Sequence, residues 1–415
     1  MSESTYALCD VNSFYVACER LFRPDLQNKP VIVLSNNDGC AIAMCDRSKS
    51  LGIKMGAPYF QIQSLVKKHR IECFSSNYGL YGDISQRFNW VLNQFADKVS
   101  PYSVDESFLK LDGFNNDLTE YCRTLKDTVN EWLSLPICIG LGPTKTLAKV
   151  ANHYAKKHKV STHGVVDLSN TRHREWALRR MRVDQVWGIG RRLSQKLRLH
   201  GINSAWELHN AEYKTLQRMF SVNMERTILE LRGQPCLAFD ELPQPKQSIL
   251  NSRSFGNTIT EYKDLKEALA YHATRCCEKL RLQSSLASSI QLFLYTRDGQ
   301  HLSKTLTFTE PNDDTSLFLK AIELGLQGIY RKGCHYKKAG VTLLGLVPSK
   351  GYQSDIFNKA PQRPELMSSL DSINAKYGQD TIKFGSLGFA KRWAMRCNSR
   401  SPRYTSRWSD VIQVK

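Results

Sequence analysis

Three acidic residues with the chemistry to bind a cation interrupt or end strand-like segments of this chain: Asp10 and the adjacent pair Asp105 and Glu106. Asp10 follows the apolar run 6–9, and the pair interrupts the run 102–109. Charged residues are poor strand formers and are rarely buried unless they are paired or bound to metal. Three carboxylates brought together repel one another unless a cation neutralises them. In a chain with a net charge of +19, this pattern predicts a divalent-metal site that serves phosphoryl chemistry.

Phosphoryl and nucleotidyl transfer need an attacking oxygen, a leaving oxygen and a phosphorus centre held together, and two Mg²⁺ ions about 3.5–4 Å apart can stabilise both oxygens. Carboxylates from neighbouring strands can bridge such ions. Adjacent residues of a regular strand point to opposite faces, so a turn or bulge at Asp105 and Glu106 is needed if both are to approach one cluster. The composition leaves open an alternative, an acidic hairpin turn solvated at the surface. Asp10, which is followed closely by Phe14 and Tyr15, favours the metal site.

Length and composition indicate several folded domains that act on a polyanion. The chain has 415 residues, which predicts about three domains, and 41% hydrophobic residues, as in globular proteins. An excess of 58 Lys and Arg over 39 Asp and Glu favours nucleic acid or an acidic membrane surface. We find no apolar run near the ~18 residues of a spanning helix and no signal-peptide pattern, so we expect a cytoplasmic protein that does not act at a membrane. The twelve cysteines contain no CxxC pair, which argues against zinc and fits reduced thiols.

The elements that must position the acidic residues alternate between strands and helices over the first ~165 residues, which indicates an α/β or α+β arrangement. Asn36–Gly39, between two apolar runs, is a tight-turn signal. Strands are expected at Tyr6–Asp10, Pro30–Leu34, Ala41–Cys45, Val99–Val104, Ser107–Leu111 and Ile137–Leu141, and helices at Asp83–Ala96 and Leu118–Leu133.

The remainder of the chain divides into a basic helical region, a linker, a second mixed region and a tail. Residues 166–235 are helical in pattern and rich in arginine, and the prolines of 241–247 mark a linker. From Pro348 onward the tail is rich in Pro, Ser and Arg. Between linker and tail we expect strands at Ile249–Phe255, Ser289–Tyr295, Ser303–Phe308 and Lys338–Leu346, and helices at Tyr262–Leu282 and Ser316–Tyr330.

Two stretches, 10–19 (DVNSFYVACE) and 102–108 (YSVDESF), resemble the palm signature of Y-family translesion DNA polymerases. Further motifs of that family follow in the same order along nearly the whole chain, at 34–40, 74–78, 144–149, 186–192 and 401–405. The resemblance is closest to the UmuC branch, which includes relatives carried on mobile elements, and it implies error-prone lesion bypass in the bacterial SOS response to DNA damage.

Two rival interpretations stay open beside this one. A single-subunit DinB-like polymerase belongs to the same superfamily, although the runs 35–40 and 401–405 favour the UmuC branch. A catalytically silent DNA-binding scaffold would use only the basic surface. Retention of all three carboxylates and of Tyr15 argues against the scaffold.

The resemblance implies an α+β multidomain fold shaped as a right hand. Its parts would be a palm of mixed sheet and helices at 1–25 and 75–165, small fingers at 26–74, a helical thumb with a helix–hairpin–helix at 166–237, a linker at 238–247, an α/β little-finger domain at 248–347 and a partner-binding tail at 348–415.

By the same resemblance, Asp10, Asp105 and Glu106 are the catalytic carboxylates, and they bind two Mg²⁺ ions with the carbonyl of Val11 as a further ligand. A primer 3′-OH would attack the α-phosphorus of a dNTP and release pyrophosphate. Tyr15 stands at the steric-gate position, where its ring would clash with a ribose 2′-OH.

The nucleotide contacts implied by the resemblance are Phe14, Lys49 and Lys156, although packing is the simpler role for Phe14. Several relatives have arginine at the position of Lys49 and tyrosine at that of Asp46. The contacts of the fingers with the triphosphate are therefore expected to differ from those of these relatives.

Two further motifs point to DNA and to partner proteins. Gly188, Ile189 and Gly190, followed by Arg191 and Arg192, have the form of a hairpin whose backbone N–H groups bind a DNA phosphate. Gln353, Ile356 and Phe357 resemble the short peptide that holds the β sliding clamp, an extended segment with two apolar anchors. The family also implies primer–template DNA, a processed UmuD dimer and a RecA filament as partners.

Overall fold

The computed structural model describes residues 5–113, 117–239, 245–353, 363–389 and 391–412. The chain forms two compact units, one of residues 1–35, 40–242 and 399–415 and the other of 36–39 and 243–398. Among the described helices, none is long and apolar enough to cross a membrane.

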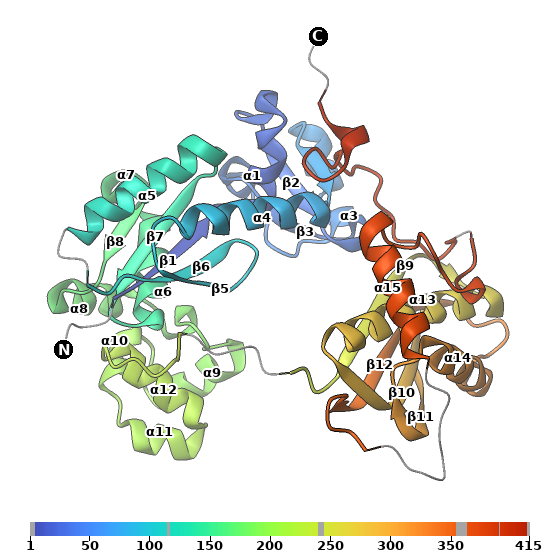
Figure 1. Ribbon diagram of the computed structural model, residues 1–415. Helices are drawn as coiled ribbons and strands as arrows, with labels where there is room; N and C mark the ends of the chain where they lie inside the picture. Colours follow the sequence, from blue (N-terminus) through green and yellow to red (C-terminus); the bar gives the residue numbers. More distant parts are fainter. Residues whose placement is uncertain (1–4, 114–116, 240–244, 354–362, 390, 413–415) are drawn as a thin grey trace. The chain divides into compact units, whose positions relative to one another are not determined.

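A five-stranded sheet forms the centre of the first unit (Figure 1), with β1 as its middle strand, antiparallel to β6 on one side and to β7 on the other. All six residues of β1 are buried, as expected for a strand covered on both faces. In spatial order the strands are β5 (Lys98–Pro101), β6 (Glu106–Lys110), β1 (Tyr6–Val11), β7 (Ile137–Gly142) and β8 (Val165–Asp167).

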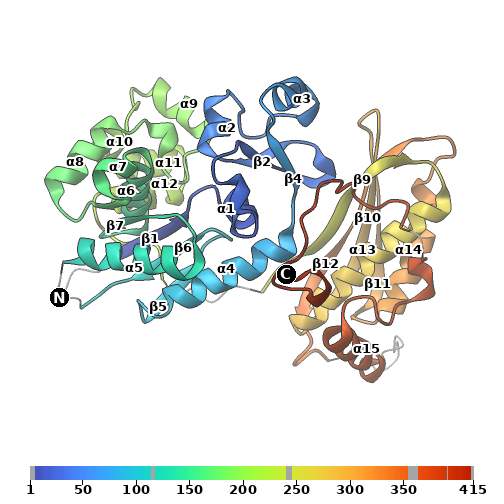
Figure 2. The same cartoon turned by 90° about the horizontal axis from the view of Figure 1, so that it is seen from above.

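The alternation of side chains along β1 separates two helical layers (Figures 1 and 2). Odd residues such as Ala7 and Cys9 join the core formed with α4 (Tyr78–Leu92) and α5 (Leu118–Leu133). The even residue Leu8 packs instead with Ala148 of helix α6. Helix α6 spans Lys145–Lys157. Asp10, also even, therefore projects on the α6 face.

A three-stranded sheet and its helices follow the first strand and helix α1 (Phe14–Leu21). Its core contains Ile32, Leu34 and Ile53. The turn expected at 36–39 is confirmed, since Asn37 and Asp38 have φ values of 60° and 52°. The elements are β2 (Val31–Leu34), β3 (Ala41–Met44) and β4 (Glu72–Ser75) in the order β3-β2-β4, with η1 (Pro24–Leu26), η2 (Asn36–Asp38), α2 (Asp46–Ser50) and α3 (Tyr59–Lys68).

Beyond β8, the first unit continues as short helices around their own apolar core, which includes Leu178, Leu197 and Ile228. This confirms the helical pattern expected for this part of the chain. The elements are α7 (Lys159–Thr162) before β8, and then α8 (Thr171–Arg180), η3 (Val183–Gln185), α9 (Arg191–Leu199), α10 (Ala205–Asn210), α11 (Tyr213–Met219) and α12 (Val222–Leu231).

The second unit is a four-stranded antiparallel sheet with two long helices on one face (Figure 2). Trp393, 1% exposed, belongs to this core. Arg281 and Asp371 form an ion pair at 2.6 Å, which joins α15 to α13. The sheet order is β11 (His301–Asn312), β10 (Ser285–Thr296), β12 (Tyr336–Pro348) and β9 (Ile249–Ile259), with helices α13 (Tyr262–Leu282), α14 (Thr315–Ile329) and α15 (Pro364–Tyr377) and the 3₁₀ turn η4 (Gly385–Leu387). The last 3₁₀ turn, η5 (Trp408–Asp410), belongs to the first unit.

Two expected elements near the acidic residues have different bounds in the structure. Helix α4 begins at Tyr78 rather than Asp83 because the side chain of Asn77 accepts a hydrogen bond from Leu80 N and caps the helix. Strand β5 ends at Pro101 rather than Val104, and a turn occupies the residues that follow.

Candidate active site

Asp10 and Glu106 face each other across the two central strands. They are cross-strand partners in the antiparallel pair β1–β6, so both side chains lie on the α6 face of the sheet. Asp10 is only 3% exposed, and its Oδ2 forms an ion pair with Lys156 Nζ. Glu106 accepts from Lys149 Nζ at 3.0 Å. Lys149 and Lys156 are seven residues apart on α6, so one face of this helix supplies both positive charges.

The environment drives the protonation of the two carboxyl groups in opposite directions. Burial raises the pKa of Asp10 to about 7, against the charge of Lys156 and together with the neighbouring Glu106. Burial also acts to raise the pKa of Glu106, but the neighbouring Asp10 and the charge of Lys149 outweigh it and hold that pKa below its usual value. Two carboxylates this close share a proton or require a cation.

Asp105 lies in the turn between β5 and β6, so the turn that the sequence required is present. Its carbonyl accepts from Val11 N at 2.9 Å, which fastens the turn to the end of β1. Its carboxylate accepts from Ser103 Oγ at 2.6 Å and is not gathered with the other two. Among the described residues, no three His, Cys, Asp or Glu side chains form a group able to hold a metal ion. The structure therefore brings Asp10 and Glu106 together and leaves Asp105 beside them.

The residues nevertheless fit a divalent cation. Oδ1 of Asp10 is buried and finds no hydrogen-bond partner within the described part of the chain. Carboxylate oxygens are the ligands that Mg²⁺ prefers. A cation at this position would relieve both the repulsion between the carboxyl groups and the unpaired oxygen.

A cavity of about 270 Å³ collects most of the residues that the sequence singled out. Tyr15 is half-buried in its wall, and its ring stacks on Tyr81 at a centroid distance of 4.4 Å. Phe14 is 3% exposed and belongs to the core, so packing is its main role. The predicted residues that line this cavity are Asp10, Val11, Phe14, Tyr15, Lys49, Asp105 and Lys156.

A larger cavity of about 640 Å³ shares Lys49 and Lys156 with the first and has a basic lining. Lys49 also binds Asp46 at 2.9 Å, and Lys159 reaches the same carboxylate at 3.5 Å. Asp46 therefore forms ion pairs with two lysines at the edge of the larger cavity. The other lining residues include Asn12, Ser13, Lys157 and His158.

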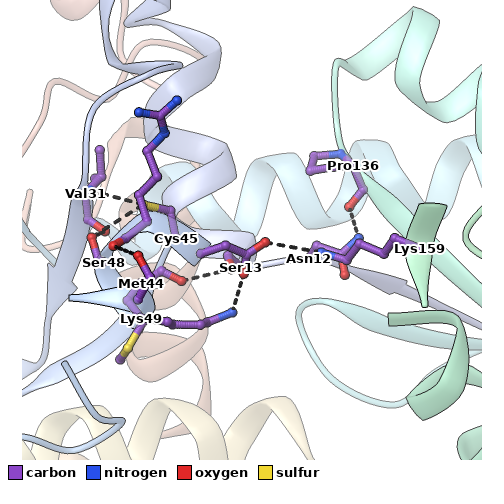
Figure 3. A network of polar contacts seen from close by, with 12 residues as sticks. Asn12, Ser13, Val31, Met44, Cys45, Ser48, Lys49, Pro136 and Lys159 are labelled. Carbon is purple, nitrogen blue, oxygen red and sulfur yellow. Dashed lines mark hydrogen bonds and ion pairs between the residues drawn. The ribbon is translucent and has the colours of Figure 1, made fainter. Parts of the chain in front are cut away.

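A network of polar contacts surrounds Asn12 and Ser13, which line the larger cavity (Figure 3). Ser13 Oγ donates to Met44 O at 2.9 Å, and Asn12 Nδ2 donates to Pro136 O at 3.1 Å. Ser13 has a left-handed backbone, with φ 52°, immediately before helix α1. In Figure 3, Lys49 extends toward Ser13. The network fixes the loop that joins strand β1, which carries Asp10, to helix α1, which carries Tyr15.

The candidate DNA-binding hairpin is a turn at the start of helix α9. Gly188 has φ +86°, a value that a side chain rarely adopts, and Gly190 is the N-cap residue of α9. Ile189 is buried, whereas Arg191 and Arg192 are exposed. A one-turn 3₁₀ helix, η3, precedes the hairpin. The glycine backbone and two arginines thus lie on the surface, with Ile189 as the anchor.

Of the candidate clamp-binding residues, the structure describes Gln353. Gln353 is exposed and has no regular secondary structure. Ile356 and Phe357 lie outside the described residues.

Sequence reasoning missed several residues at the site: Lys149, Lys157, Lys159, Ser13, Asn12 and, behind Tyr15, Tyr81. Lys149 and Lys156 are spaced for one face of a helix, so the sequence contained a signal for Lys149. Using that signal required knowing that α6 lies against β1, which the sequence alone does not show.

Comparisons with known proteins show the family of the chain. The sequence profile described as the impB/mucB/samB family matches residues 9–153, its C-terminal domain matches 246–356, and a domain of unknown function, DUF4113, matches 364–414. Protein UmuC of Salmonella typhimurium is 42% identical over 99% of this chain and 100% of its own length. DNA polymerase IV of Moorella thermoacetica is 26% identical over 92% of this chain and 95% of its own.

A solved structure shares the fold. The Y-family DNA polymerase chimera Dbh-Dpo4(243-245)-Dbh aligns with a TM-score of 0.66 and 19% identity, over 83% of this chain and 99% of that one. The α+β multidomain fold expected from the sequence is thereby confirmed. Together with the near-complete match to UmuC, this places the chain in the impB/mucB/samB family, as a UmuC-like translesion DNA polymerase of the Y-family.

Proposed function

We propose that the chain transfers a nucleotide from a dNTP to a primer 3′-OH at Asp10, Asp105 and Glu106, with the five-stranded sheet of the first unit as the palm. The observation that carries this proposal is the buried facing pair Asp10 and Glu106, set at the edge of a basic cavity. Asp105 lies beside the pair and lines the cavity of Tyr15. The alternative interpretation, an acidic hairpin turn of Asp105 and Glu106 solvated at the surface, does not explain why Glu106 lies opposite the buried Asp10.

Two Mg²⁺ ions are the proposed cofactor, held by the three carboxylates and the Val11 carbonyl. When bound, Mg²⁺ stabilises negative charge on the attacking and leaving oxygens. Before Mg²⁺ binds, two lysines offset the negative charge of the carboxyl groups: Lys156 pairs with Asp10, and Lys149 pairs with Glu106.

The triphosphate would occupy the larger cavity. Lys49, Lys156, Lys157 and Lys159 all line it, and a triphosphate fits a site of converging ammonium groups. Lys156 lines both cavities, so its ammonium can neutralise Asp10 or a phosphate. Because Asp46 binds both Lys49 and Lys159, we propose that Lys156 and Lys157 are the main phosphate contacts.

Tyr15 is the proposed sugar filter. Its ring lines the cavity of Asp10 and is supported from behind by Tyr81, so it is a rigid wall rather than a mobile side chain. A rigid ring under the sugar rejects a 2′-OH by steric overlap.

Primer–template DNA is the proposed macromolecular substrate, positioned in part by the turn Gly188–Arg192. Such contacts to phosphates carry no base information, which suits an enzyme that copies any template. A processed UmuD dimer, a RecA filament and the sliding clamp are proposed partners, supported by the 42% identity to UmuC. The lower identity to DNA polymerase IV, 26%, argues against the single-subunit rival.

The test is Asp105→Asn, assayed for primer extension and for binding of primer–template. Loss of one carboxylate should lower extension by about 10³-fold or more, because electrostatic stabilisation of this kind carries a large share of the rate. DNA binding should persist. Extension at the rate of the unmodified enzyme would refute the catalytic assignment.

A further inference from the structure

The segment Ser399–Tyr404, here called the C-terminal strap, is part of the first unit although it lies at the end of the chain. Ser75 N donates to Ser399 O at 3.0 Å, and Ser399 N donates to Ser75 Oγ at 3.0 Å. Arg400 forms a parallel bridge with Ser75. The strap thus pairs side by side with the end of strand β4, and it lies within the part of the sequence matched by the domain of unknown function.

Asn77, 1% exposed, recognises the strap through its side-chain amide. Its Nδ2 donates to Ser401 O and Ser401 Oγ, each at 3.0 Å, and to Pro402 O at 3.1 Å. The ring of Tyr404 stacks on Phe22, just after helix α1, at a centroid distance of 4.5 Å. The strap is therefore held against both α1 and the start of α4 by polar and aromatic contacts.

The strap completes a buried carboxylate site. Glu19 of helix α1 is 0% exposed, and its Oε1 accepts from Tyr81 OH at 2.6 Å and from Ser401 Oγ at 3.0 Å. Burial raises the pKa of Glu19, and these two hydrogen bonds oppose that rise. A buried carboxylate is costly unless it is hydrogen-bonded, so a group serving only to fill space would be apolar. The hydroxyl of Ser401 is one of two side-chain donors to this oxygen.

Tyr81 connects that carboxylate site to the nucleotide cavity. Its ring stacks on Tyr15 with an interplanar angle of 16°, and its hydroxyl is fixed by Glu19. Glu19 and Tyr15 are four residues apart on α1, so they lie on the same face of that helix. The contacts form a continuous path from Ser401 through Glu19 and Tyr81 to Tyr15.

We propose that the C-terminal strap sets the sugar selectivity of the polymerase, with Ser401 as a positioning residue that fixes Tyr81 and thereby the ring of Tyr15. This inference rests on the proposed role of Tyr15 as the sugar filter. Removing the Ser401 hydroxyl leaves Glu19 one donor short. Glu19 is then held by Tyr81 alone, so its carboxylate can shift together with the Tyr81 hydroxyl, and Tyr15 loses part of its rigid support. The strap contacts no reacting atom, so its effect is on discrimination rather than on the chemical step.

The experiment measures kcat/KM for a dNTP and for the matching rNTP with the full chain. Tyr15→Ala, Ser401→Ala, Tyr81→Phe and the double variant Ser401→Ala/Tyr81→Phe are compared. Ser406→Ala, a change at an exposed serine just beyond the strap, is the control. Tyr81→Phe keeps the ring against Tyr15 and removes only the link to Glu19. A thermal unfolding scan of each variant verifies that it is folded.

Ser401→Ala and Tyr81→Phe should each lower the dNTP-to-rNTP selectivity by about 2- to 10-fold, the effect of one hydrogen bond. The double variant should lower it no further than either single one, since both cut the same path. If Tyr15→Ala relaxes selectivity while Ser401→Ala and Tyr81→Phe behave like Ser406→Ala, the role of the strap is refuted. If Tyr15→Ala itself changes nothing, the sugar filter is misassigned and the strap inference is overturned together with it.

Discussion

At the scale of single residues, the site is governed by two carboxyl groups on one face of a sheet and two lysines on one face of a helix. Asp10 is buried by its strand, and its charge is supported by Lys156. The same lysine lines both the cavity of Tyr15 and the larger basic cavity. Because Lys156 borders both cavities, it can affect the carboxylate of Asp10 and the substrate at the same time.

Lys156→Met should lower kcat/KM for dNTP incorporation by about 10- to 100-fold, the range for losing a hydrogen bond to a charged group. Both KM and kcat should change, because the substituted side chain can neutralise neither a phosphate nor Asp10. Single-nucleotide insertion kinetics measure this. Lys68→Met, at an exposed lysine of helix α3, is the matched control and should match the unmodified enzyme. Equal kinetics for the two variants would contradict the proposed role of Lys156.

At the scale of elements, the sequence predicted what periodicity and caps encode. Helices α5 and α13 have the expected bounds because each has an apolar stripe, and Asp117 caps the first of them. Strand β4 was missed because its four residues, Glu-Cys-Phe-Ser, form no continuous apolar run, unlike the equally short strands β2 and β3. Helix α15 was missed because its polar surroundings resemble a tail.

The candidate site, too, could be predicted only in part from the sequence. The strand ends carrying Asp10 and Glu106 could be found from sequence, since charge after an apolar run is visible there. The orientation of Asp105 toward Ser103 could not, because it depends on one side-chain hydrogen bond within the turn. The partner of Tyr15 was also beyond reach, since Tyr81 comes from a helix 66 residues further along the sequence.

Helix α6, which carries Lys149 and Lys156, packs closely against strand β7. A Cβ on Gly140 would lie 2.1 Å from Asn152 N and 2.3 Å from Ala148 O, both backbone atoms of α6. Gly140→Ala should therefore destabilise the first unit by about 2 kcal/mol or more. Gly82→Ala, on α4 with open space around it, should instead stabilise by about 0.5–1 kcal/mol. Urea denaturation of both variants measures the change in the free energy of unfolding. Equal midpoints would show that α6 shifts easily to make room for the added methyl group.

A buried histidine makes the second unit sensitive to acid. His272 is 0% exposed, its Nδ1 is 2.6 Å from Asn251 Oδ1, and burial together with the charge of Arg253 lowers its pKa to about 3. The unfolded chain takes up this proton near pH 6.5, while the folded unit does not. The stability of the unit should therefore be level above pH 6.5 and fall below it, by about 2 kcal/mol at pH 5.

Hydrogen exchange of the α13 amides as a function of pH, corrected for the intrinsic rate, reports that stability locally. His272→Gln, which cannot titrate, should remove most of the decline. Parallel profiles for the two proteins would assign the acid sensitivity to other groups.

At the scale of the whole molecule, the net charge of +19 dominates the encounter with nucleic acid. A field of this sign attracts any phosphate backbone, so affinity and sequence preference are separate properties. The turn Gly188–Arg192 would then fix where a duplex rests rather than whether it binds.

The logarithm of the DNA affinity should fall linearly with the logarithm of salt concentration, with a slope of about −0.9 per phosphate contacted. Replacing both Arg191 and Arg192 by Gln should reduce the slope by about 0.9 for each arginine that contacts a phosphate. Arg123→Gln, on helix α5, is the control and should leave the slope unchanged. Fluorescence anisotropy with a primer–template at several salt concentrations measures this. An unchanged slope in the double variant would place the duplex elsewhere.

The position of the strap at the end of the chain also has a consequence in time. The rest of the first unit is translated before residues 243–398, and Ser401 comes only after them. At about 5–20 residues per second, that interval lasts roughly 10–30 s. A nascent chain, or one that stops early, therefore contains the carboxylates and Tyr15 but lacks the hydroxyl that the strap provides to Glu19. The full sugar selectivity would be reached only once translation had passed the strap.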